Sequence, residues 1–148
     1  MENKISPLRQ KLVSIALEWQ ATFGISPPIT STLSELGAAL ILGCKLDEYA
    51  LCLKDRTAVS KGYDFMFQSK RYQVKANRPS GKKGSFVTLV AKAKNYEWDY
   101  LIWILYNQEY EIEEAWIWDV ETYKAKFDSM KRLSPKHMRI GRKLKTYT

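Results

Sequence analysis

Apolar residues near the start of the chain recur every three or four positions, which is the spacing of one face of a helix. This pattern predicts a helix over residues 7–22, and the glycine and two prolines within 23–28 end it. A second apolar stretch predicts a helix over 33–42, followed by a short helical or irregular piece over 45–53. The first pattern is formed by Leu8, Leu12, Ile15, Ala16 and Trp19.

The middle of the chain changes to the period-two alternation of β-strands. Residues 62–75 have the pattern of two short strands joined by a tight turn, and a loop with basic residues and glycines follows over 77–84. The chain, 1–148, fits a single α/β or α+β domain that ends in a basic tail over 129–148. Further strands are predicted over 86–90, 100–106 and 113–118, and a further helix over 120–127.

Polar residues converge in the predicted hairpin. If Ser69-Lys70 forms the turn, Asp64 pairs with Lys75 across the two strands. Gln73 lies two residues before Lys75 and therefore shares its face. An acid, an amide and a lysine on one face predict a site for a divalent cation with a lysine beside it. This inference depends on the register of the hairpin.

The net charge of +8 is unevenly distributed along the chain. Residues 61–94 contain nine Lys and Arg residues against one Asp, and residues 129–148 contain seven basic residues and no acidic one. Residues 95–128 contain nine acidic residues against two lysines. Basic side chains around the candidate site favour a polyanionic partner, because neutralised phosphates release counterions. A solvated basic surface without such a partner is the alternative.

Other classes of protein are disfavoured by the sequence. No apolar run approaches the ~20 residues that span a bilayer, so we expect no membrane contact and a cytoplasmic location. Cys44 and Cys52 are expected to be core thiols in a reducing compartment rather than a disulfide or a zinc site. His137 is the only histidine, so no histidine cluster is available for catalysis.

Asp64 is the only acid in a long basic stretch, and a lone carboxylate there suits Mg²⁺, which takes oxygen ligands and keeps several waters. Gln73 offers an amide oxygen to the same cation, and Val74 offers its backbone carbonyl. Lys75 could orient or deprotonate a water and stabilise charge at a phosphate. An ion pair of Asp64 with Lys75 or Arg71 is the alternative.

Glu35 has two interpretations that can hold together. It fits a capping box in which Thr32 is the N-cap of the second helix. It also borders the apolar stripe of that helix, so it could face the hairpin site and help to hold a cation or its water.

The arrangement of Glu35 on a helix, Asp64 after Gly62-Tyr63, and Gln73-Val74-Lys75 on the next strand resembles the PD-(D/E)xK nuclease superfamily. That superfamily includes restriction endonucleases, repair nucleases and junction resolvases. The resemblance covers residues 34–118 and implies a restriction-endonuclease-like fold, with a mixed central sheet of four to five strands flanked by helices. It also implies Mg²⁺, or Mn²⁺, at the two strand positions, a lysine that assists the attacking water, and a helix glutamate that completes the site.

The sequence departs from the family pattern at two positions. Gln73 stands where the family usually has Glu or Asp, in a Gln-x-Lys variant known among methyl-directed restriction nucleases. Tyr63 stands where Pro is common. The missing charge at Gln73 should weaken cation binding, which favours a one-metal site or a stronger role for Glu35.

We therefore expect a Mg²⁺-dependent DNA endonuclease of restriction type or similar, of prokaryotic, viral or mobile-element origin. Alternatives are a catalytically inactive DNA-binding module of the same fold, a Holliday-junction-resolvase-like nuclease, and an interaction domain whose charge blocks pair across a dimer. Cleavage of both strands favours a homodimer with one site for each strand. The residues expected to contact DNA are Arg71, Arg78, Lys82, Lys83, Lys136, Arg139, Arg142 and Lys143.

Overall fold

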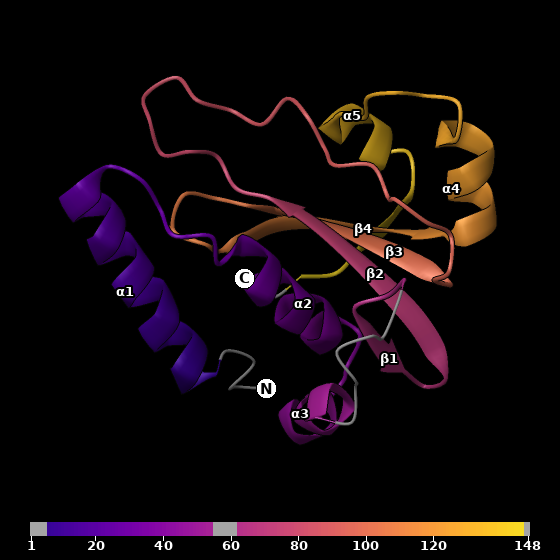
Figure 1. The fold of residues 1–148 in the computed structure, drawn as a ribbon, viewed down its shortest axis with the longest axis horizontal. Helices are drawn as coiled ribbons and strands as arrows, with labels where there is room; N and C mark the ends of the chain where they lie inside the picture. Colours follow the sequence, from indigo (N-terminus) through magenta and orange to yellow (C-terminus); the bar gives the residue numbers. More distant parts are fainter. Residues whose placement is uncertain (1–5, 55–61, 147–148) are drawn as a thin grey trace.

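The computed structural model describes residues 6–54 and 62–146, in which five strands form one mixed sheet (Figure 1). The strands follow the order β1-β2-β3-β4-β5, with β2 and β3 parallel and the other neighbours antiparallel. The predicted α/β fold, a mixed central sheet flanked by helices, is confirmed. The strands are β1 (Phe65–Phe67), β2 (Lys70–Asn77), β3 (Tyr100–Tyr106), β4 (Ile112–Asp119) and β5 (Arg142–Leu144).

Helices cover both faces of the sheet (Figure 1). The first three pack on one face and the last two on the other. The helices predicted over 7–22 and 120–127 are confirmed to within one residue at each end, and the piece over 45–53, for which a helical or an irregular structure was open, is helical from residue 46 to 54. The helices are α1 (Pro7–Phe23), α2 (Thr30–Ile41), α3 (Leu46–Lys54), α4 (Val120–Phe127) and α5 (Pro135–Met138).

The central strand β3 contributes to two separate cores because its side chains alternate between the faces of the sheet. Ile102 and Ile104 join the core under α1, α2 and α3, whereas Leu101 and Trp103 join the core under α4 and α5. All four side chains are fully buried. This double burial explains why the sequence of β3 is almost continuously apolar.

The second helix begins earlier than the sequence predicts. α2 starts at Thr30, and the Ile29 carbonyl accepts a hydrogen bond of 3.0 Å from the Leu33 amide. The predicted capping box of Thr32 and Glu35 is therefore wrong, because both residues lie inside the helix. Burial of Leu33 against the sheet fixes this start, so packing rather than a polar cap determines where α2 begins.

The tight turn of the hairpin also lies one residue earlier than predicted. Its two central residues, Gln68-Ser69, have φ values of 50° and 65°, as in a type I′ turn. Phe65 consequently pairs with Tyr72, and the two buried rings stack with a centroid distance of 5.2 Å. The predicted pairing of Asp64 with Lys75 is wrong, because the earlier turn brings this aromatic pair together.

The prediction of a strand over 86–90 is also wrong. In the described part of the chain, its β-pairing is limited to one bridge between Val90 and Leu133. Phe86 and Leu89 are 76% and 54% exposed, so the segment has no continuous buried side. It forms part of the irregular connection 78–99 that crosses from β2 to β3.

Within the described residues, the basic tail predicted over 129–148 is folded onto the sheet. It contains α5 and β5, and β5 pairs with β4. Leu133 and Met138 are buried in the core under α4 and α5. The basic side chains of this segment are therefore held on a folded surface. Among the described residues, no helix has the length and apolar character needed to cross a membrane.

Candidate functional site

Asp64 lies directly before β1 and continues the pairing of that strand with β2. Its backbone N–H donates a hydrogen bond of 2.8 Å to the carbonyl of Tyr72. The regular pairing ends at Phe65 and Tyr72, and the Asp64 side chain reaches Gln73, whose Nε2 donates to Asp64 Oδ2 at 3.1 Å. Because the observed turn lies one residue earlier than the predicted turn, the partner of each strand residue changes by two positions. Side chains alternate with period two, so each one stays on its predicted face of the sheet. Asp64, Gln73 and Lys75 therefore share a face, as predicted, although in a different register.

One carboxylate oxygen of Asp64 organises the open end of the hairpin. Asp64 Oδ2 accepts a hydrogen bond of 2.7 Å from the Val74 backbone N–H and one of 3.1 Å from Gln73 Nε2. Val74 lies beyond the point where β1 pairs with β2. The carboxylate thus satisfies an amide that would otherwise lack a strand partner, and this contact fixes the position of the acid.

The backbone of Val74 adds an oxygen donor at the same edge of the sheet. The N–H and C=O groups of one strand residue project to the same side of the strand. Because the Val74 N–H points to Asp64, the Val74 carbonyl is directed to the edge where that carboxylate lies. Two oxygen donors of this kind fit the ligand preference of Mg²⁺.

Gln73 directs its amide nitrogen toward Asp64. To share a cation with Asp64, the amide must turn over and present Oε1, which breaks this 3.1 Å hydrogen bond. Across residues 6–54 and 62–146, no group of three or more His, Cys, Asp and Glu side chains is arranged to hold a metal ion. A cation at this site would therefore depend on few charged ligands and retain much of its water.

Lys75 faces the core under α4 and α5, beside Trp103 in the neighbouring strand β3. Burial lowers the pKa of the Lys75 ammonium; Asp64 opposes this shift and Lys94 adds to it. A lysine that loses its proton more easily is better suited to accept one from water. No local pattern indicates Lys94, because it lies in the irregular connection between β2 and β3.

Glu35 is partly buried in the middle of α2. This helix packs on the sheet face that carries Tyr72 and Val74, whereas Gln73 and Lys75 point to the other face. The participation of Glu35 in the site stays a prediction.

Two of the arginines predicted to contact DNA form ion pairs on the face of Lys75. The Arg71 guanidinium contacts Asp99 at 3.2 Å, and the Arg139 guanidinium contacts Glu114 at 2.7 Å. These contacts lower the pKa of both carboxyl groups. Both arginines are partly exposed, so each ion pair orients a guanidinium at the surface.

Arg78 connects three parts of the fold. Its Nη2 donates to Gln20 Oε1 of α1 at 2.8 Å, and its Nε donates to the Gln108 carbonyl at 2.9 Å. The guanidinium also lies 4.0 Å above the ring of Tyr110. Because its donors are engaged in this way, we expect Arg78 to position the basic loop.

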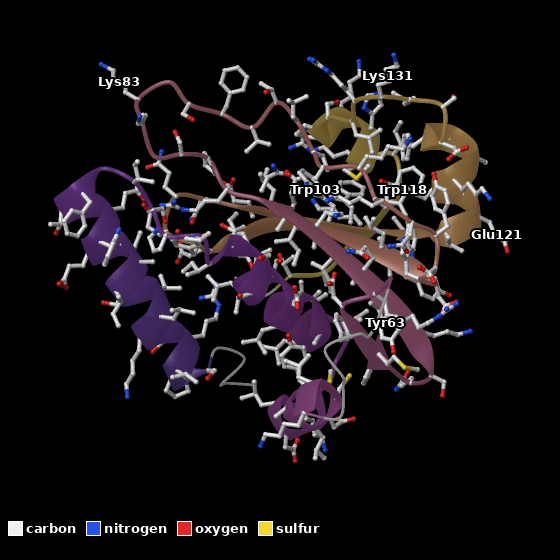
Figure 2. All side chains as sticks on the ribbon, viewed as in Figure 1. Tyr63, Lys83, Trp103, Trp118, Glu121 and Lys131 are labelled. Carbon is white, nitrogen blue, oxygen red and sulfur yellow. The ribbon has the colours of Figure 1, made fainter. Side chains whose placement is uncertain are left out.

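The other basic residues predicted to contact DNA are exposed. Lys83 projects from the connection between β2 and β3, away from the body of the protein (Figure 2). The turn that carries it is closed by a hydrogen bond of 2.9 Å from the Ser85 amide to the Lys82 carbonyl. The exposed set is Lys82, Lys83, Lys136, Arg142 and Lys143.

Gly62 determines how the chain approaches Asp64. It has a φ of 82°, and a Cβ at this position would lie 2.5 Å from the Cβ of Glu97 and 3.2 Å from Asn95 Oδ1. Only glycine combines this backbone conformation with this contact. The sequence could not indicate the contact, because it joins segments that are distant along the chain.

No family model matches the sequence, and no curated protein matches it either. The likeness to the PD-(D/E)xK superfamily therefore rests on the residue pattern alone.

Proposed function

We propose that the protein is a Mg²⁺-dependent DNA endonuclease that uses Asp64, Gln73, Lys75 and Glu35. The main support is the hairpin site. Asp64 Oδ2 lies between the Val74 amide and Gln73 Nε2, and Lys75, with its lowered pKa, shares their face. A fixed carboxylate beside a lysine that can become neutral suits phosphodiester hydrolysis.

Each residue would have a separate role in the reaction. Asp64, the Val74 carbonyl, Gln73 Oε1 after rotation of its amide, and Glu35 would hold Mg²⁺ or Mn²⁺. When bound, the ion supplies positive charge that stabilises the developing charge on phosphorus-bound oxygens. Neutral Lys75 accepts a proton at Nζ from the attacking water. The water oxygen forms a bond to phosphorus, the bond to the leaving ester oxygen breaks, and solvent protonates that oxygen.

The choice of DNA as substrate is supported by the exposed basic residues. Lys82 and Lys83 extend from the segment that follows the site strand, and Lys94 adds charge beside Lys75. Phosphate contacts of this kind give strong, salt-dependent affinity without sequence preference. A nuclease of restriction or mobile-element type would act in the cytoplasm, and a homodimer would cut both strands.

A panel of DNA substrates tests this function. The wild-type protein should cleave at least one of supercoiled, linear and four-way-branched DNA in Mg²⁺ or Mn²⁺, and EDTA should stop the reaction. Preference for the branched substrate would indicate a resolvase-like nuclease. Absence of cleavage from the whole panel with both metals would contradict the proposal.

A DNA-binding module without catalysis is the second candidate. It is favoured by one observation. Gln73 Nε2 donates a hydrogen bond to Asp64 Oδ2, so the two side chains satisfy each other's polar atoms without a cation. In that case the protein should bind DNA equally well with EDTA and with Mg²⁺, and Asp64→Asn should leave the affinity unchanged.

A further inference from the structure

The first helix exposes a continuous apolar stripe. Leu8, Ile15, Trp19 and Phe23 are between 51% and 74% exposed, although they follow one another at helical spacing. The rings of Trp19 and Phe23 lie against each other with centroids 4.7 Å apart. Scattered exposed apolar residues are ordinary, but a stripe along a whole helix indicates a surface that another molecule covers.

The stripe lies beside the face by which α1 joins the domain. On that second face Ala16 is buried and Val13 and Leu17 pack against the core under α1, α2 and α3, and the half-buried Leu12 lies where the two faces meet. Polar contacts also hold the helix, since Arg9 donates to the Tyr110 carbonyl at 2.6 Å. α1 lies at the outer edge of the molecule (Figure 1). The exposed stripe therefore faces solvent at a position that a second helix can reach.

The spacing of the stripe is that of a coiled-coil seam. Leu8, Leu12, Ile15 and Trp19 alternate in steps of four, three and four residues, which keeps them on one line when two helices cross at a shallow angle. An antiparallel pair of α1 helices would place Leu8 against Trp19 and Leu12 against Ile15 of the other copy. The same surface then serves both copies, as a two-fold axis requires.

The charges beside the seam are complementary under the same two-fold axis. Lys11 and Glu18 are exposed and seven residues apart, so both lie on the flank of the seam that faces away from the domain. In the antiparallel arrangement Lys11 of one copy and Glu18 of the other differ in height by about 3 Å along the helix axis. Both side chains lean toward their own N-terminus, which reduces this offset. The arrangement would form two identical ion pairs.

We propose that α1 is the surface through which two copies of this chain associate, by antiparallel pairing of their exposed stripes. The inference does not rest on the proposed nuclease activity, because association can be measured without DNA or metal. Sedimentation equilibrium at low ionic strength should give a dimer for the wild-type chain at micromolar concentration. Ile15→Glu should give a monomer, whereas Leu51→Glu, which changes an exposed apolar residue of α3, should leave the dimer intact.

Charge exchange tests the direction of the pairing. Lys11→Glu and Glu18→Lys should each weaken association several-fold, because each creates two like-charge contacts. The combined variant Lys11→Glu with Glu18→Lys should restore the wild-type constant. These exposed substitutions are expected to preserve the fold, which melting curves can check. A monomeric wild-type chain, a dimer insensitive to Ile15→Glu, or failure of the combined variant to recover would each overturn the proposal.

Discussion

Asp64 and Val74 form the central contact of the candidate site: the carboxylate Oδ2 accepts a 2.7 Å hydrogen bond from the Val74 backbone N–H. The contact continues the β-pairing past the start of β1 with a side chain in place of a strand. It gives Asp64 a structural role and, at the same time, fixes the carboxylate beside Gln73 and Lys75. The structural and catalytic interpretations of Asp64 are therefore compatible.

Gln73→Glu should strengthen cation binding. The substitution adds a second carboxylate where the superfamily usually has one, but it removes the Nε2 donor and places two negative charges together. Without metal the variant should melt at a lower temperature than the wild type. Mg²⁺ should raise the melting temperature of the variant by more than it raises that of the wild type. Gln10→Glu, an exposed change on α1, is the control. Equal responses of the two variants to Mg²⁺ would contradict this assignment of Gln73.

The pH dependence of cleavage should follow the protonation of Lys75. Its pKa is lowered by burial, so the neutral amine becomes available below the ordinary pKa of lysine. If neutral Lys75 is the base, the cleavage rate should rise with pH through this lowered pKa and then level off. A rate that falls over the same range would show that the ammonium form is needed.

Lys75→Met should abolish cleavage without lowering stability near neutral pH. The unfolded chain binds the Lys75 proton more tightly than the folded chain does, so this residue makes stability rise with pH between the two pKa values. The variant should lack this contribution and melt at the wild-type temperature or above. Lys70→Met, on an exposed residue of the same strand, is the control for charge. A marked loss of stability specific to Lys75→Met would contradict the account.

Gly62→Ala should destabilise the fold more than Gly24→Ala. Both glycines have positive φ, 82° and 85°, but only Gly62 has atoms of Glu97 and Asn95 where a Cβ would lie. The left-handed backbone alone costs roughly 1–2 kcal/mol for an L-residue, so chemical denaturation should give about this loss for Gly24→Ala and a larger one for Gly62→Ala. Similar losses for both variants would show that the contact with Glu97 has no energetic effect.

Removal of the two loop lysines should weaken DNA binding in a salt-dependent way. Each phosphate contact contributes about 0.9 to the slope of log affinity against log salt concentration on duplex DNA. Lys82→Ala with Lys83→Ala should therefore reduce this slope by up to about 2. Lys45→Ala, an exposed change directly before α3, should leave it unchanged. An unaltered slope for the loop variant would exclude the loop from the DNA interface.

Local sequence patterns predicted the regular elements well where a single periodicity dominates. The steps of three and four residues defined α1, and the apolar run over 100–106 defined β3, because each pattern follows from one or two buried faces. The hairpin turn was misplaced because Gln68-Ser69 carries no glycine or asparagine to mark a type I′ turn. The stacking of Phe65 on Tyr72, which decides the register, is a tertiary effect.

Strand alternation also predicts which residues of the hairpin share a face, but it does not predict their contacts with distant segments. Asp64, Gln73 and Lys75 were grouped correctly because strand alternation depends on parity and survives a turn that moves by one residue. The proximity of Lys94 to Lys75 and the contact of Gly62 with Glu97 could not be predicted. Both bring the irregular connection before β3 back to the hairpin, and no local pattern encodes such a contact.

The most direct test of the nuclease proposal compares three proteins on the preferred DNA substrate in Mg²⁺ or Mn²⁺: wild type, Asp64→Asn and Glu121→Gln. Asparagine keeps an oxygen that can accept the hydrogen bond from the Val74 amide. The Asp64→Asn variant should therefore fold and bind DNA, while its cleavage rate falls by about a hundredfold or more. Glu121 is an exposed acid on α4 (Figure 2), and its variant should cleave like the wild type. Equal cleavage by all three proteins, or none by the wild type, would contradict the account.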